Sequence, residues 1–174
     1  VLLTAVRAQG ITELENAAVE PEIEDLIAVL QKMGAIISLR TDRTIVIEGV
    51  EKLNGYRHRC IPDRIEAASW ACAALVTHGD VFVRGAEQKA MGTFLNVLRK
   101  IGAGVDIHDD GIRFYDTGRG LSSAAIETDV HPGFMTDWQQ PLVVLLTQAN
   151  GISIVHETVY ENRLGFTSAL NDMG

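Results

Sequence analysis

Gly10-Ile11-Thr12-Glu13-Leu14 returns in altered form as Gly79-Asp80-Val81-Phe82-Val83 and again as Gly151-Ile152-Ser153-Ile154-Val155. Each copy places a glycine before a run in which apolar and polar residues alternate. This pattern is typical of a strand that is entered through a turn. The three copies indicate that the sequence repeats itself with a period of about 70 residues.

A second marker has the same spacing. Leu30, Met33 and Gly34 match Leu98, Ile101 and Gly102, and they match again in Leu170, Met173 and Gly174. In the first two copies the preceding apolar residues fall at i, i+3, i+4, i+7 and i+10, which predicts a helix with one apolar stripe. The members of the two stripes are Ile23, Leu26, Ile27, Leu30 and Met33, and Met91, Phe94, Leu95, Leu98 and Ile101. Gly34 and Gly102 are predicted to end these helices in the left-handed conformation.

A hairpin is predicted after each helix, over residues 35–47 and 103–115, and a further helix such as Arg64–His78 closes the unit. Strands and helices that alternate in this way predict an α/β (α+β) fold, in which helices cover one face of each sheet. We expect the repeats to pack around a shared helical core. The glycine-rich and basic stretch Gly49–Pro62 is the best candidate for a domain junction.

Composition argues against several classes of protein. The 174 residues carry a net charge of −8, which argues against a nucleic-acid groove. No run of 18 apolar residues predicts a membrane-spanning helix. Cys60 and Cys72 are too few for a disulfide framework, and the five histidines show no ligand spacing, so we expect a reduced, cytoplasmic protein without metal. Both ends look cut, so we expect a piece of a longer protein.

The third copy breaks the rule of the other two. Arg163 stands where the first two stripes have Ile23 and Met91, although Phe166, Leu170 and Met173 continue the stripe. One interpretation is that Arg163 lies in a frayed first turn and reaches water. The other is that its guanidinium contacts an anion or a carboxylate in a cleft, because a buried cation needs such a partner.

Two carboxylates stand at predicted helix starts. Thr136 and Gln139 have the spacing of a capping box, which would place Asp137 in the first helical turn, in a helix up to Gln148. Asp63 and Glu66 have the same spacing at the start of an earlier helix. Both sites have a structural interpretation as caps. Because they follow the same point in the repeat, they can also converge on one cleft, where a carboxylate can act as a base.

Four motifs carry a resemblance over essentially the whole chain: residues 14–23 (LENAAVEPEI), 62–66 (PDRIE), 131–139 (HPGFMTDWQ) and 157–163 (ETVYENR). They resemble the UDP-N-acetylglucosamine 1-carboxyvinyltransferase family of enolpyruvyl transferases, which begins peptidoglycan synthesis. The resemblance implies two pseudo-threefold domains of βαβαββ units, an inside-out α/β barrel. Residues 1–61 then form the last unit of the first, catalytic-loop domain. Residues 62–174 begin the second domain, with its third unit ending at Gly174.

The resemblance also implies a reaction and its residues. The enolpyruvyl group of phosphoenolpyruvate moves to the 3′-hydroxyl of UDP-N-acetylglucosamine, through addition to C2, protonation of C3 and loss of phosphate, with no metal or cofactor. Asp137 matches the candidate general base, and Thr136 and Val159 match contacts to the nucleotide sugar. Arg163 and Glu161 match a charged pair that lines the cleft. Asp63 and Glu66 match acids at the crossover between the domains.

The family's loop with a catalytic cysteine, its N-terminal Lys-Asn pair and its substrate arginines have no match in this sequence. We therefore expect the chain to be inactive without the rest of the parent polypeptide. Two alternatives stay open. One is the sister enolpyruvyl transferase of the shikimate pathway, and the other is a repeat-built binding module without chemistry. In the second case Asp137 and Arg163 are a cap and a surface residue.

Overall fold

The computed structural model describes all 174 residues, Val1–Gly174. The chain forms two compact units, unit 1 from Val1 to Ile61 and unit 2 from Pro62 to Gly174. None of its helices is long and apolar enough to cross a lipid bilayer. Which repeat of which domain each unit represents stays a prediction.

Unit 1 contains the first repeat. The order of its elements is α1 (Leu2–Ala5), β1 (Ile11–Leu14), α2 (Pro21–Lys32), β2 (Ile36–Leu39) and β3 (Ile45–Glu48). The three strands form an antiparallel sheet in the order β1-β3-β2. Its core is made by apolar residues of α1, α2 and the sheet, among them Val6, Ile27, Leu30, Ile37, Ile45 and Ile47.

Unit 2 repeats this plan. β4 (Asp80–Arg84), α4 (Gln88–Ile101), β5 (Gly104–His108) and β6 (Gly111–Tyr115) follow one another as β1, α2, β2 and β3 do. The sheet order β4-β6-β5 is that of unit 1, and all of its pairings are antiparallel. The predicted strand, helix and hairpin are therefore confirmed in two copies with one topology.

The helix ends confirm the role predicted for two glycines. Gly34 has φ +98° and Gly102 has φ +97°, a conformation that glycine adopts without the clash of a Cβ atom. In each case the next residue donates its N–H to a carbonyl of the last helical turn, Ala35 to Leu30 and Ala103 to Leu98. These are the bonds that close a helix C-terminus and turn the chain into the following strand.

The third copy is shorter and differs from the expectation. β8 (Ile154–His156) pairs in parallel with β7 (Ala125–Glu127), a strand that the sequence pattern did not predict. Between them lie the 3-10 turn η1 (Thr136–Trp138) and α5 (Gln139–Leu146). The last helix, α6 (Thr167–Asp172), buries none of its residues. Of the expected stripe, Phe166 and Leu170 are only partly covered by the rest of the chain, and Met173 is 83% exposed.

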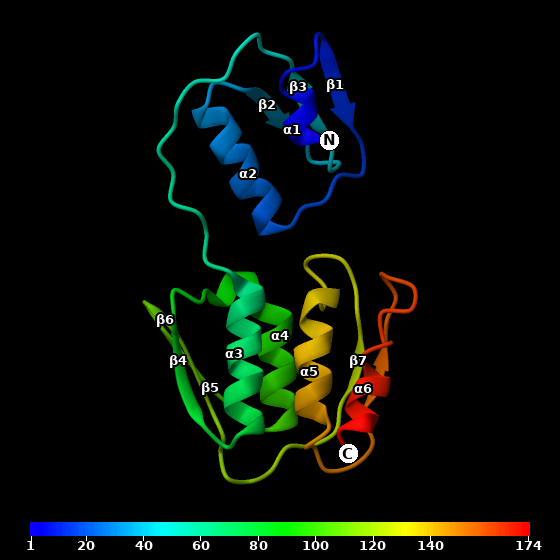
Figure 1. Ribbon diagram of the computed structural model, residues 1–174. Coiled ribbons are helices and arrows are strands. Elements are labelled where there is room, and N and C mark those ends of the chain that lie inside the picture. Colours follow the sequence, from blue (N-terminus) through cyan, green and yellow to red (C-terminus); the bar gives the residue numbers. More distant parts are fainter. The chain divides into compact units, whose positions relative to one another are not determined.

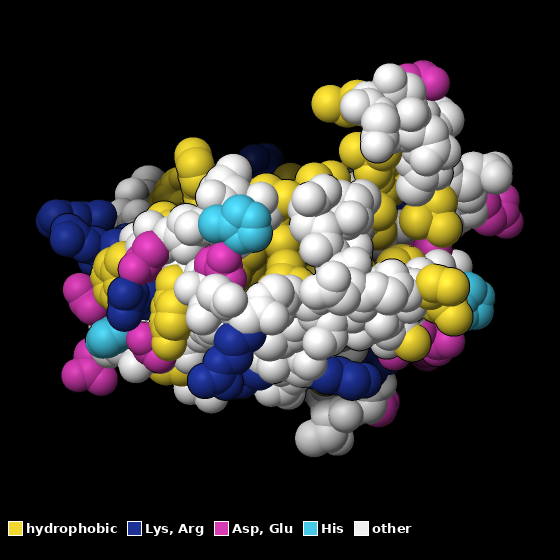
Figure 2. All heavy atoms as spheres, turned by 90° about the horizontal axis from the view of Figure 1, so that it is seen from below, with side chains coloured by type: hydrophobic (Ala, Val, Ile, Leu, Met, Phe, Trp, Pro, Cys, Tyr) yellow, Lys and Arg dark blue, Asp and Glu magenta, His cyan; other side chains and the backbone are white.

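The repeat pattern closed the first unit with helix α3 (Arg64–Val76), whereas the resemblance put it in the second domain; it packs within unit 2, against α4, α5 and the strands β4 and β6. Figure 1 shows α3, α4 and α5 side by side, between the sheet of β4 to β6 and the pair β7-β8. The core of unit 2 includes all five residues of the α4 stripe (Met91, Phe94, Leu95, Leu98 and Ile101), each with 0% exposure. On the face drawn in Figure 2, basic side chains are interspersed with acidic and hydrophobic ones rather than gathered into one patch.

Candidate active site

The segment Thr136–Trp138 does not form the predicted capping box. It is the 3-10 turn η1, and α5 begins after it at Gln139, with Trp138 at the N-cap position and no side-chain cap. The physical reason is the burial of Trp138. This side chain is 1% exposed and packs 5.5 Å from the ring of Phe94 and 5.6 Å from that of Phe134. Burying so large an aromatic surface outweighs one capping hydrogen bond.

Asp137 forms an ion pair with Arg163. The guanidinium Nη2 donates to Oδ1 of the carboxylate, and it also stacks over the ring of Tyr160 at 5.0 Å. With its amide turned to satisfy both of its neighbours, Gln140 accepts from Arg163 Nε at 2.6 Å and donates to the Thr136 carbonyl at 3.2 Å. Arg163 lies in the turns that precede α6, not in a frayed helical turn. The structure thus favours the carboxylate contact over the interpretation that Arg163 only reaches water.

The Asp137 side chain remains reachable. It is 40% exposed and the Arg163 side chain is 25% exposed, so the ion pair is open to solvent on one side. A carboxylate that is oriented by a guanidinium and exposed to solvent can accept a proton from a bound hydroxyl group. No side chain caps η1 or α5, and Asp137 lies in the first turn of η1 with its carboxylate turned to Arg163.

Glu157 joins the remaining residues of the cluster. Its carboxylate accepts from Thr136 Oγ1 at 2.7 Å, from the Val159 N–H at 2.9 Å and from the Tyr160 N–H at 3.1 Å. Burial acts to raise the pKa of Glu157, but the hydrogen bonds it accepts together outweigh burial and lower the pKa. Glu157 thereby ties Thr136 of η1 to Val159 and Tyr160 in the segment that follows β8.

Asp63 is the N-cap of α3, as its spacing predicted. Its carboxylate accepts from the N–H of Ile65 at 2.8 Å and from that of Glu66 at 3.0 Å. Glu66 does not complete the box, because its carboxylate accepts from the indole of Trp70 at 3.2 Å instead. Both acids are exposed at the start of the helix.

Arg64 brings the start of α3 to the candidate site. The indole N–H of Trp138 donates to the Arg64 carbonyl at 3.3 Å, and the guanidinium lies 5.5 Å above the Trp138 ring. The same guanidinium reaches the carbonyl of Ala90 at 3.4 Å and Nδ1 of His131 at 3.2 Å. A 3% exposed arginine therefore joins the first turns of α3 and α4 to η1.

The N-termini of α3, α4 and α5 lie at one end of unit 2, as Figure 1 shows and the contacts of Arg64 require. Unpaired N–H groups and the helix dipole make such an end attractive to anions. The starts of α3 and η1 are therefore neighbours, joined by the bond from Trp138 to Arg64; that their carboxylates share one cleft stays a prediction.

The structure brings together Thr136, Asp137, Val159 and Arg163, with Asp63 and Glu66 at the neighbouring helix start. Glu161 is the exception: it is exposed and forms no ion pair with Arg163, whose partner is Asp137.

The sequence analysis missed four residues of this cluster: Glu157, Tyr160, Gln140 and Arg64. The first two lie in the ETVYENR motif, so their position next to Val159 was the available signal. No group of three metal-ligating side chains lies in this cluster; the one such group in the chain, Asp25, His58 and Cys60, is in unit 1.

Comparison with known proteins identifies the family. The family model for EPSP synthase (3-phosphoshikimate 1-carboxyvinyltransferase) matches residues 1–174. The chain belongs to the EPSP synthase family. Within this family it is 56% identical over 173 residues to a UDP-N-acetylglucosamine 1-carboxyvinyltransferase of Protochlamydia amoebophila, covering 99% of this chain and 37% of that protein. The protein of the same name from Chlamydia pneumoniae is 50% identical, with 99% of this chain and 38% of that protein covered.

The fold of this EPSP synthase family member agrees with solved structures. The enolpyruvyl transferase NikO from Streptomyces tendae superposes with a TM-score of 0.85 at 27% identity, covering 99% of this chain and 41% of that one. EPSP synthase from Acinetobacter baumannii gives a TM-score of 0.60 at 18% identity, over 88% of this chain and 36% of that one, which supports the fold alone. The chain spans less than half the length of the relatives and solved chains that it matches.

Proposed function

We propose that the chain is part of an enzyme that transfers the enolpyruvyl group of phosphoenolpyruvate to the 3′-hydroxyl of UDP-N-acetylglucosamine, a step of peptidoglycan synthesis. The observation that carries the proposal is the similarity to proteins named for this activity, 50% to 56% identical over 173 residues. The open ion pair of Asp137 with Arg163 gives the proposal a chemical basis. The partners are these two substrates and the rest of the parent polypeptide, in the cytoplasm.

Asp137 is proposed as the general base. Its carboxylate accepts the proton of the sugar hydroxyl as the oxygen forms a bond to C2 of phosphoenolpyruvate and C3 takes up a proton. Loss of phosphate and of a proton from C3 then restores the double bond in the product. Arg163, held by Gln140 and Tyr160, orients the carboxylate.

Binding is proposed for the neighbouring groups. Thr136 and Val159, fixed through Glu157, contact the nucleotide sugar, and Glu161, Asp63 and Glu66 line the approach. Both substrates are anions, so the helix N-termini at this end of unit 2 favour their binding.

A second candidate is the sister reaction with shikimate 3-phosphate as the acceptor, which the description of the matching family model favours. The higher identity to the nucleotide-sugar enzymes makes this the weaker candidate. The two candidates differ only in the acceptor, so one experiment separates them.

The test measures phosphate release by a full-length polypeptide that carries this segment, with phosphoenolpyruvate and either acceptor. Release that depends on UDP-N-acetylglucosamine is expected. Release only with shikimate 3-phosphate transfers the assignment to the sister reaction, and release with neither contradicts both. The 174-residue chain assayed alone is expected to release none, because the matches to the catalytic loop and the substrate arginines are lacking.

A further inference from the structure

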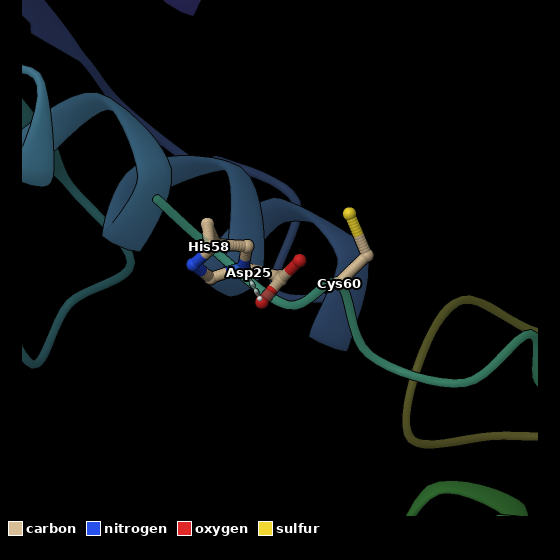
Figure 3. Close-up of side chains that lie close together, drawn as sticks. All are labelled: Asp25, His58 and Cys60. Carbon is tan, nitrogen blue, oxygen red and sulfur yellow. Dashed lines mark hydrogen bonds and ion pairs between the residues drawn. The ribbon is translucent and has the colours of Figure 1, made fainter. Parts of the chain in front are cut away.

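Three side chains of different chemistry converge in unit 1: Asp25 on α2, and His58 and Cys60 on the segment after β3. Each can offer one ligand atom, and these atoms all lie within 4.8 Å of one another. The closest pair is His58 Nε2 and Asp25 Oδ1 at 2.9 Å. Figure 3 shows the carboxylate of Asp25 between the imidazole ring and the side chain of Cys60.

The backbone explains why these residues meet. The segment after β3 is tied to the end of α2, where the Asn54 N–H donates to the Met33 carbonyl at 2.8 Å. From there it runs back along the helix. Four extended residues cover about 13 Å and eight helical residues about 12 Å, so His58 arrives at the level of Asp25. In an extended chain residues i and i+2 point to the same side, which brings Cys60 to the cluster as well.

The donor set fits a transition metal of the zinc type. Thiolate sulfur, imidazole nitrogen and carboxylate oxygen are the three ligand types that zinc binds in proteins, and a site with three protein ligands leaves one position for water. The thiolate and the carboxylate together balance a charge of 2+. The side chains of His58 and Asp25 are only 7% and 17% exposed, so the site has a shielded side, whereas Cys60 is exposed.

The distances need only small changes. Ligand atoms in a tetrahedral zinc site are separated by roughly 3.3–3.6 Å, as the metal–ligand bond lengths require. The contact between His58 and Asp25 then opens by less than 1 Å, and the exposed Cys60, whose sulfur lies within 4.8 Å of the other two ligand atoms, turns inward by at most about 1.5 Å. We propose that Asp25, His58 and Cys60 form a binding site for a zinc-type metal ion, which fastens residues 58–60 to α2.

Lys32 competes with the metal. Its ammonium lies 2.7 Å from His58 Nδ1, and since an ammonium only donates, Nδ1 accepts and Nε2 carries the proton that faces Asp25. Metal binding at Nε2 moves this proton to Nδ1 and expels Lys32. The substitution Lys32→Gln should therefore tighten metal binding, because its amide oxygen can accept from Nδ1–H and support the metal-bound tautomer.

The test is a titration of the reduced 174-residue chain with Co²⁺, whose bond to a thiolate gives a charge-transfer absorption in the near ultraviolet. One equivalent should bind with this absorption. Cys60→Ser should abolish the absorption, and Cys72→Ala, which alters the buried cysteine of unit 2, should leave it unchanged. Asp25→Asn and His58→Gln should weaken binding by at least the roughly 10–100-fold that loss of an outer-shell partner costs.

Three results overturn the proposal: no thiolate absorption at a large excess of Co²⁺, absorption that survives Cys60→Ser, or absorption lost in Cys72→Ala. Because Cys60 is exposed, its variant does not depend on refolding of the core. Binding that Lys32→Gln leaves unchanged or weakens overturns the assignment of Nε2 as the ligand atom. None of these readouts uses enzymatic activity, so the proposal stands or falls independently of the function proposed above.

Discussion

Asp63 and Asp137 follow the same point in successive repeats, but their carboxylates have different partners. Asp63 accepts two backbone N–H groups at the start of α3, whereas Asp137 pairs with Arg163 and leaves α5 without a side-chain cap. The same difference separates Met91, which is fully buried, from Arg163 at the matching position of the third copy. The comparison teaches that a repeat keeps its topology while single side chains exchange a cap or a core contact for an ion pair.

The largest effect is expected for Asp137→Asn in a full-length enzyme that carries this segment. Loss of a positioned base should lower kcat by about 10²–10⁴-fold, because the amide cannot accept the hydroxyl proton. Steady-state kinetics and circular dichroism check the result and the fold. Asp63→Asn is the matched control, since asparagine also caps helices, and its kcat should fall far less. Equal losses in both variants would show that the two carboxylates do not differ in role.

The matching helices α4 and α2 differ in burial, so the next largest effect is a loss of stability. Phe94 of α4 has 0% exposure, and the matching Leu26 of α2 is half-buried, because α4 is flanked by α3 and the sheet of its own unit. Phe94→Ala should therefore lower the free energy of unfolding by about 3–5 kcal/mol. Urea denaturation followed by tryptophan fluorescence measures this, since both tryptophans, Trp70 and Trp138, lie in unit 2.

Leu26→Ala is the matched control for that measurement. It should leave the tryptophan transition within about 0.5 kcal/mol of the native value, because the change lies in unit 1. A shift as large as that of Phe94→Ala would contradict the separation of the two cores.

A smaller loss of stability is expected when the Asp63 cap of α3 is removed. Asp63→Ala removes the acceptor of two N–H groups and should cost about 1 kcal/mol in the free energy of unfolding. The control Asp63→Ser keeps an acceptor and should cost clearly less. The same urea titration measures both variants, and equal losses would argue against the capping role.

The smallest effect concerns pH. Because the folded-state pKa of Glu157 lies below its ordinary value of 4.5, its hydrogen bonds stabilise the fold fully above that value. The stabilisation is lost as the pH falls through the lowered folded-state pKa. Thermal denaturation at a series of pH values measures the decrease of the unfolding midpoint toward acid pH. In Glu157→Gln this decrease (the acid limb) should be less steep. Glu161→Gln, which alters an exposed carboxylate of the same segment, should leave the limb unchanged.

How much of the site was predictable depended on whether its bonds are local. The cap of Asp63 reaches residues two and three positions away, so its spacing was sufficient. The capping box at Thr136 failed because Trp138, three residues before Pro141, is drawn into a core that includes Phe94, and Glu157 takes the Thr136 hydroxyl. Spacing also gave no sign that His58 and Cys60 lie beside Asp25, since that contact depends on the path of the chain along α2.

The sequence by itself determined the repeated strand, helix and hairpin, the glycines that end the helices, and the motifs of the family. These features rest on periodicity and on local hydrogen bonds, which neighbouring residues specify. Only the tertiary structure decided the contacts of α3 with α5, the unpredicted strand β7, the pairing of Asp137 with Arg163 and the buried position of Arg64. Each of these depends on surfaces far apart along the chain, whose burial and charge pairing outweigh local preference once the core has formed.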